Sequence, residues 1–201
     1  MASYQTGFPT TENPISEGGA WTSGPGAWGN IQIASARARP VVNAELEAAR
    51  VATPTIGAAQ YSQAVYFGVA GANDRDGGPT TRMASTTDGD CYALDVDIQP
   101  NTHQLYRIDD TGTLATTQLG ADLTGTPTSG STYRLESRGS THEGKKDGAS
   151  LGTRTDTTYT TGQPGIFFYQ DGGALGDVQL DDFDGGDLTG FSPSASLSPS
   201  A

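Results

Sequence analysis

The stretch that decides the fold is Cys91-Tyr92-Ala93-Leu94-Asp95-Val96-Asp97-Ile98, followed by Gln99-Pro100-Asn101 and then by Thr102-His103-Gln104-Leu105-Tyr106-Arg107-Ile108. Apolar side chains recur at every second position of the first run, which is the period of a β-strand with one buried face. The Pro-Asn pair between the runs favours a chain reversal. The stretch therefore predicts an antiparallel hairpin.

Alternation also predicts which side chains of this hairpin share a face. We assign one buried face to the larger apolar residues, Tyr92, Leu94, Val96, Ile98, Tyr106 and Ile108. The opposite face then carries Ala93, Asp95, Asp97, His103, Leu105 and Arg107. Opposite charges on neighbouring strands stabilise a sheet by about 0.2–1 kcal/mol per pair, so this is ordinary sheet chemistry unless the face is concave. On a concave face, Asp95, Asp97 and Arg107 are candidate ligand-binding residues.

Short strand patterns continue along most of the chain, with Gly, Asp, Asn and Pro clusters between them. We expect further strands at 31–33, 63–69, 80–85, 114–119, 132–137, 150–155, 165–169 and 178–183. Residues 45–51 fit either one turn of helix or a strand. Regularly spaced strands with turn residues between them, and no alternation of strands with helices, predict an all-β sandwich or barrel.

The chain divides into three segments by composition. Residues 1–29 predict an irregular N-terminal arm that packs on the domain through its aromatic residues, and residues 30–190 predict one β-sandwich domain. Residues 191–201 are almost entirely Ser, Pro and Ala. A segment with so little apolar surface is expected to be disordered and to act as a linker or the start of a stalk.

Charge and cysteine content exclude several classes of function. The formal net charge of −12 opposes binding to nucleic acid or to an anionic membrane. The single cysteine, Cys91, allows no internal disulfide, and its position in an apolar strand predicts a buried, unreactive thiol. No run is apolar enough to span a bilayer, and the first residues do not read as a signal peptide. These features together predict that the protein is located on a virion or an extracellular surface.

Several of these patterns resemble one family. The segments 8–21, 92–94, 104–108, 133–140, 159–166 and 180–188 are similar to successive strands of concanavalin A-like, laminin-G-like jelly rolls, a domain type found in bacteriophage structural and environmental proteins. The resemblance covers residues 8–188 and implies a jelly-roll β-sandwich whose last strand lies beside the N-terminal one. It specifies the fold better than the activity.

Catalytic patterns of jelly-roll enzymes are missing from the sequence. Retaining jelly-roll glycosidases, as a family, carry a Glu-x-Asp-x-x-Glu motif on one strand, and none of the six glutamates of this sequence stands in that spacing. His103, Tyr106 and Arg107 do not all point to one side of a strand, as a lyase would require. No Gly-x-Ser-x-Gly segment accompanies the two histidines. We therefore expect a protein that is not an enzyme.

Two kinds of ligand remain compatible with the sequence. We expect no required cofactor, although two loops concentrate the hard oxygens that Ca²⁺ prefers: Asn73, Asp74 and Asp76 in one, Asp181, Asp182 and Asp184 in the other. These side chains also serve as ordinary turn formers. For sugar stacking, the candidate aromatic residues are Trp28, Tyr66 and Tyr169, each of which is also a candidate for the core.

The sequence thus predicts a non-catalytic structural or adhesive module exposed on a phage-like virion or surface assembly. The expected partners are cell-surface glycans and other virion or filament subunits, with the module present as a homo-oligomer or tethered to a larger assembly. Two alternatives remain open. One is a carbohydrate-active enzyme of jelly-roll fold, a glycoside hydrolase or a polysaccharide lyase. The other is a purely structural subunit that assembles through its sheet edges or its aromatic N-terminal arm.

Overall fold

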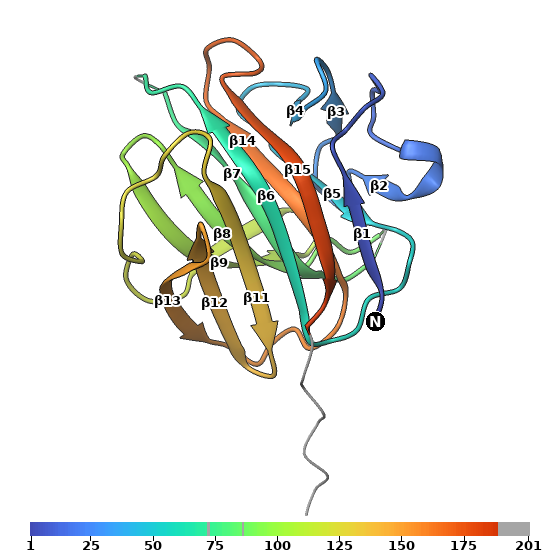
Figure 1. Cartoon of the computed structure of the whole chain (residues 1–201), viewed down its shortest axis with the longest axis vertical. Coiled ribbons are helices and arrows are strands. Elements are labelled where there is room, and N and C mark those ends of the chain that lie inside the picture. The colour runs from blue at the N-terminus through green and yellow to red at the C-terminus, as the bar shows by residue number, and fades with distance from the viewer. Residues whose placement is uncertain (72, 86, 189–201) are drawn as a thin grey trace, which may run out of the picture.

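The computed structural model describes residues 1–71, 73–85 and 87–188. These residues form two antiparallel β-sheets that pack face to face, so the predicted all-β sandwich is confirmed. In Figure 1 the sheet that contains β6, β11 and β15 lies in front of the sheet that contains β7, β8 and β14. The Ser/Pro-rich segment 191–201 lies outside the described residues, and its role as a linker stays a prediction.

The strands have the following bounds: β1 Ser3–Thr6, β2 Trp21–Ser23, β3 Ile31–Ile33, β4 Ala38–Pro40, β5 Leu46–Val51, β6 Gln60–Gly68, β7 Arg75–Met83, β8 Cys91–Asp97, β9 Thr102–Asp110, β10 Leu114–Gln118, β11 Thr132–Arg138, β12 Thr141–Lys146, β13 Ala149–Thr155, β14 Gln163–Gln170 and β15 Val178–Asp187. The eight-stranded sheet has the order β13-β12-β11-β6-β15-β4-β3, with β1 paired to β15. The seven-stranded sheet has the order β10-β9-β8-β7-β14-β5-β2. A 3₁₀ turn at Glu17–Gly19 is the one helical element among the described residues, and none of their helices is long and apolar enough to cross a membrane.

The two ends of the described chain lie side by side. Strand β1 pairs with β15 from Ser3 opposite Gly186 to Thr6 opposite Phe183, which confirms the expected contact between the first and last strands. The ring of Trp21 lies 4.7 Å from that of Phe183 between the sheets. The expectation of an irregular segment 1–29 is wrong at β1 and β2, because these residues hydrogen-bond into both sheets.

The main core fills the space between the sheets. It includes Phe8, Trp21, Tyr92, Leu94 and Phe183, and all are at most 4% exposed. Phe8 and Trp21 therefore pack in the core of their own domain. Residues 46–51, for which a helix and a strand were both open, form β5.

A second apolar cluster lies on the outer face of the seven-stranded sheet. It contains Trp28, Cys91, Ile108 and Phe167, and Tyr106 packs at its margin. The predicted faces of the β8–β9 hairpin are wrong for this reason. Asp97 pairs with Thr102 and Leu94 with Leu105, so the side chains of Tyr106 and Ile108 share a face with Ala93 and Asp95. A shift of one residue moves every side chain of a strand to the other face.

Candidate functional site

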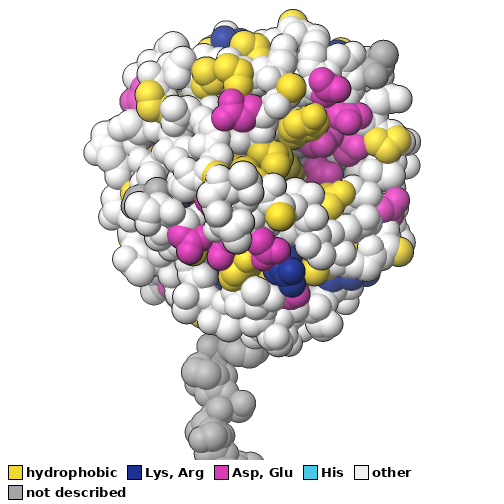
Figure 2. All heavy atoms as spheres, turned by 180° about the vertical axis from the view of Figure 1, so that it is seen from behind, with side chains coloured by type: hydrophobic (Ala, Val, Ile, Leu, Met, Phe, Trp, Pro, Cys, Tyr) yellow, Lys and Arg dark blue, Asp and Glu magenta, His cyan; other side chains and the backbone are white. Residues whose placement is uncertain are grey.

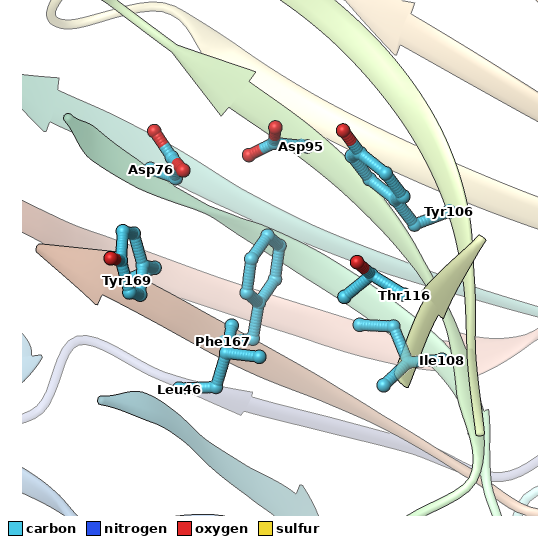
Figure 3. Close-up of a pocket in the computed structure, with 8 residues that line it drawn as sticks. All are labelled: Leu46, Asp76, Asp95, Tyr106, Ile108, Thr116, Phe167 and Tyr169. Carbon is cyan, nitrogen blue, oxygen red and sulfur yellow. The ribbon is translucent and has the colours of Figure 1, made fainter. Parts of the chain in front are cut away.

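A pocket opens on the outer face of the seven-stranded sheet. Figure 2 shows this side of the molecule, where acidic and hydrophobic side chains gather around a hollow. The pocket has a volume of about 210 Å³ and extends across strands from β5 to β10. Figure 3 shows its lining residues, which are Leu46, Asp76, Asp95, Tyr106, Ile108, Thr116, Phe167 and Tyr169.

The strand register explains why these residues meet. Tyr169 of β14 stands opposite Asp76 of β7, and Asp76 stands opposite Asp97 of β8. Asp95 lies two positions along β8 from Asp97 and therefore on the same face. One row of the sheet thus places an aromatic ring beside two carboxyl groups, with a third carboxyl group in the next row.

Gly78 makes room at the centre of this face. It pairs with Phe167 across β7 and β14. A Cβ atom on Gly78 would lie 2.1 Å from the carbonyl oxygen of Leu94 and 3.7 Å from the Phe167 ring. Since real Cβ atoms do not approach a backbone oxygen so closely, the strands reach this spacing only with glycine at position 78.

The carboxyl groups of the pocket are buried and incompletely bonded. Asp95 is 5% exposed and Asp97 is 6% exposed. The Oδ1 atoms of Asp76 and Asp95 are buried and have no hydrogen-bond partner among the described residues, whereas Oδ1 of Asp97 accepts a bond from the Gln99 amide at 2.8 Å. A buried acceptor without a partner costs free energy, so both Oδ1 atoms are available to a ligand that brings donors.

Burial and mutual repulsion shift the titration of these carboxyl groups upward. Burial raises the pKa of Asp76, and the nearby charges of Asp95 and Asp97 raise it further. Burial likewise raises the pKa of Asp95 well above its usual range, with Asp97 adding to the effect. The pKa of Asp97 is also raised, mainly by burial. The site therefore holds protons to a higher pH than isolated aspartates do.

Two tyrosines form the walls beside the acids. The Tyr106 hydroxyl donates to Oε1 of Gln104 at 2.7 Å, and the Gln104 amide donates to Asp122 at 2.8 Å. This chain of bonds fixes the Tyr106 ring, and burial raises its pKa to about 12. Tyr169 is partly exposed, and burial also raises its pKa. Both hydroxyl groups are neutral at physiological pH and can accept hydrogen bonds.

The structure brings together only part of the predicted site. Asp95 and Tyr169 line the pocket, and Asp97 adjoins them. Trp28 and Tyr66 are wrong as exposed stacking residues, because they are 4% and 0% exposed. Trp28 packs edge-on against Phe167 and donates from Nε1 to the Gly89 carbonyl, while the Tyr66 hydroxyl donates to the Arg75 carbonyl inside the sandwich.

The prediction that Arg107 belongs to this site is also wrong. It pairs with Tyr92, whose side chain lies in the main core, so it points to the other side of the sheet from Tyr106 and Asp95. Its guanidinium group forms ion pairs with Asp109 at 3.0 Å and Asp156 at 3.3 Å. Arg107 thus supports the sandwich edge and does not neutralise the carboxyl groups of the pocket.

The predicted calcium loops do not form ligand clusters. Asp76 belongs to the pocket, while Asp74 is exposed and the Asn73 amide donates to the Asp171 carbonyl. In the other loop, Asp181 pairs with Arg37, Asp182 is exposed and Asp184 accepts from the Tyr61 hydroxyl. Within residues 1–71, 73–85 and 87–188, no group of three or more His, Cys, Asp or Glu side chains is arranged to hold a metal ion.

Sequence reasoning missed most of the lining. The residues not singled out as ligand contacts are Leu46, Tyr106, Ile108, Thr116 and Phe167. One signal was present: β14 is apolar at both odd and even positions, as in Phe167-Phe168. A strand that is apolar on both sides needs a second covered face.

Comparisons with known proteins agree on the fold. No protein-family model and no curated protein matches the sequence. Among solved structures, carbohydrate binding module CBM66 from Bacillus subtilis superposes with a TM-score of 0.54 at 14% identity, covering 84% of this chain and 94% of that chain. A Crh5 transglycosylase in complex with NAG gives 0.57 at 12% identity, with 93% and 84% covered. A prokaryotic β-1,3-1,4-glucanase (lichenase) derived from a mouse hindgut metagenome gives 0.54 at 12% identity, with 93% and 99% covered.

These neighbours overturn the expectation that the chain is not an enzyme. A transglycosylase and a lichenase share its fold with a binding module, so the absence of a Glu-x-Asp-x-x-Glu strand is no ground for excluding catalysis. A fold shared by binding modules and enzymes does not choose between them. The resemblance seen in the sequence is confirmed at the level of the fold: the chain is a concanavalin A-like jelly-roll sandwich.

Proposed function

We propose that the pocket on the outer face of the seven-stranded sheet binds a glycan. The observation that carries this proposal is the row in which the partly exposed ring of Tyr169 adjoins Asp76, together with Asp95, whose Oδ1 has no hydrogen-bond partner in the described part of the chain. A sugar ring presents an apolar face that packs on an aromatic ring. Its edge carries hydroxyl groups that can donate to free carboxyl oxygens.

The size of the pocket limits what it holds. Its volume of about 210 Å³ is below the range of about 300–1,000 Å³ that is usual for drug-sized ligands. One sugar unit, either terminal or within a chain, is therefore the proposed occupant, and the rest of a glycan would lie on the surface. The neighbours support this class of ligand, since one is a carbohydrate binding module and another was solved with NAG.

The carboxyl cluster supports a second candidate function, cleavage of a glycosidic bond. Hydrolysis of this kind uses one protonated carboxylic acid and one ionised carboxylate on opposite sides of the bond. Asp76, Asp95 and Asp97 share a face and have raised pKa values, so one can remain protonated while another ionises. A raised pKa beside a like charge is a feature of acid–base sites, although structural clusters also show it.

We further propose that the domain is displayed on a virion or another extracellular surface, tethered or as a homo-oligomer. The net charge of −12 and the Ser/Pro/Ala composition of residues 191–201 support this placement. Electron microscopy with an antibody against the domain, on particles and cells of the source, would test it. Antibody signal confined to the cell interior would contradict the proposal.

A glycan array tests the binding proposal directly. We expect the purified domain to bind at least one glycan class, and we expect Tyr169→Ala to abolish that signal. The matched control is Tyr61→Ala on the eight-stranded sheet, where Tyr61 stacks under Arg134 away from the pocket. Binding that survives Tyr169→Ala but is lost in Tyr61→Ala would place the site on the eight-stranded sheet and contradict the proposal. Release of reducing ends from a bound glycan, lost in Asp76→Asn, would establish the second candidate.

A further inference from the structure

We infer that the sugar unit held in this pocket carries a free amine, so that the ligand is a cationic, de-N-acetylated amino sugar. The inference rests on the proposed glycan-binding function and narrows its ligand class. The pocket joins a partly apolar wall to buried carboxyl oxygens that have no partner among residues 1–71, 73–85 and 87–188, and an amino sugar matches both with its ring and its ammonium group.

The first argument is the sign of the charge. The ionisable groups near the cluster come from five elements: Asp74 and Asp76 from β7 and the turn before it, Asp95 and Asp97 from β8, Tyr106 from β9, Tyr169 with Asp171 from β14 and its end, and Tyr66 of β6 from inside the sandwich. The lining residues from β5 and β10, Leu46 and Thr116, do not titrate. Among the described residues, the lining contains no Lys, Arg or His. A glycan that bears sulfate or uronate groups would meet uncompensated negative charge.

The second argument is the unpartnered oxygens. Oδ1 of Asp95 is buried in a side chain that is 5% exposed, and Oδ1 of Asp76 is buried beside it. Both line the pocket and lie at the same end of it in Figure 3. An ammonium group has three N–H donors and no acceptor, so its hydrogen-bonding groups match a site that offers several free acceptors. Hydrogen bonds between charged partners are about twice as strong as neutral ones.

The third argument is the relief of repulsion. Asp76 and Asp97 are direct cross-strand partners, and like charges placed directly opposite destabilise a sheet, so the pair keeps a proton in the free protein. A cation between them makes ionisation of both carboxyl groups favourable, whereas a neutral hydroxyl group does not. Binding an amine should therefore release protons from the cluster, since the ammonium group favours the ionised carboxylates.

Titration calorimetry with three oligosaccharides of equal length tests the inference. The probes are a glucosamine oligomer, the matched N-acetylglucosamine oligomer and a galacturonate oligomer, at low ionic strength because salt screens the contact. We expect the glucosamine oligomer to bind at least about tenfold more tightly than the acetylated one, which corresponds to about 1.4 kcal/mol. We expect the galacturonate oligomer not to bind. Repeating the titration in buffers of different ionisation enthalpy should show proton release from the protein.

Matched variants assign the preference to the cluster. Asp95→Asn should reduce the ratio of glucosamine to N-acetylglucosamine affinity to near one, while Asp182→Asn removes an exposed carboxylate of the other sheet and should leave that ratio unchanged. Equal or tighter binding of the acetylated oligomer would overturn the amine inference and leave glycan binding intact. Failure of all three probes, together with an empty glycan array, would overturn the proposed function itself.

Discussion

Asp76 on β7 and Asp97 on β8 stand directly opposite one another in the seven-stranded sheet, with no cation from the described residues bonded to either. One other buried acid of this protein is compensated by cations. Glu136 on the eight-stranded sheet forms ion pairs with Arg134, Arg138 and Lys145. Since proteins bury unpaired carboxyl groups only at a cost, the contrast between the two sheets marks the pocket as a place where stability is lost.

Replacing Asp95 with asparagine should therefore stabilise the free protein at neutral pH. The folded pKa of Asp95 is raised by burial and by Asp97. A raised folded pKa favours folding below the unfolded value of about 4, and this advantage is lost as the pH rises toward the folded value. We therefore expect Asp95→Asn to raise the free energy of unfolding at neutral pH, because asparagine does not have to be buried as an ion or to take up a proton.

Chemical denaturation of both proteins across this pH range measures the effect. The gain should shrink toward zero near pH 4, where the wild-type carboxyl group is protonated as well. Asp182→Asn, with an exposed side chain, should show no comparable dependence. A loss of stability for Asp95→Asn at neutral pH would mean that the carboxylate is compensated in the free protein.

The same hairpin shows how far the sequence alone could go. Period-two alternation correctly located β8 and β9, and the turn residues correctly predicted an antiparallel pair. Alternation does not say which of two faces is buried when both carry apolar residues. The sequence-based assignment put Tyr106 and Ile108 on the one face expected to be buried, whereas they belong to a second cluster on the outer face. The pocket was missed for that reason, although Asp95 and Tyr169 were found.

Contacts between residues far apart in the chain could not be predicted from the sequence. Trp28 reaches the Gly89 carbonyl and packs on Phe167. No local pattern distinguishes such a buried anchor from an exposed tryptophan in a glycine-rich loop. The sequence likewise placed Asp76 in a loop with Asp74, and only the pairing of β7 with β8 places it against Asp97.

His142 should make the protein less stable in acid. It is buried between the sheets, where Nδ1 lies 2.8 Å from Ser137 Oγ and Nε2 lies 3.2 Å from the Asp156 carbonyl oxygen. Burial lowers its pKa to about 4. A lowered folded pKa gives stability that is full above the unfolded value of about 6.5 and is lost as the pH falls toward 4.

His142→Gln should therefore flatten the fall of the melting temperature between about pH 6.5 and pH 4, because glutamine does not titrate there. The loss assigned to His142 is about 3 kcal/mol over that interval. Some slope should remain, since burial also lowers the pKa of His103. An unchanged slope in His142→Gln would show that the imidazole becomes protonated without cost in the folded state.

Calcium should not change the stability of the described domain. The acidic side chains of the two predicted loops are exposed, bonded to other residues or part of the pocket, and none of them forms a three-ligand group in the described part of the chain. A ligand that binds only the folded state raises stability by RT ln(1 + [L]/Kd). Since we expect no Ca²⁺ to bind these loops, we expect equal melting temperatures in millimolar Ca²⁺ and in chelator. A higher melting temperature in Ca²⁺ that disappears in Asp181→Asn would restore the predicted metal loop.

Gly78→Ala should damage both the sheet and the pocket. The added Cβ would lie 2.1 Å from the Leu94 carbonyl oxygen, so β7 and β8 would have to separate at the point where Asp76 and Asp95 are held. Overpacking of this kind typically costs about 1–3 kcal/mol. Gly7→Ala is the matched control, because its Cβ would meet no atom closer than the Asp182 carboxyl oxygen at 3.5 Å. We expect Gly78→Ala to lower the denaturation midpoint and to weaken glycan binding, and Gly7→Ala to do neither. Full stability with lost binding would instead mean that the methyl group enters the pocket and displaces the ligand.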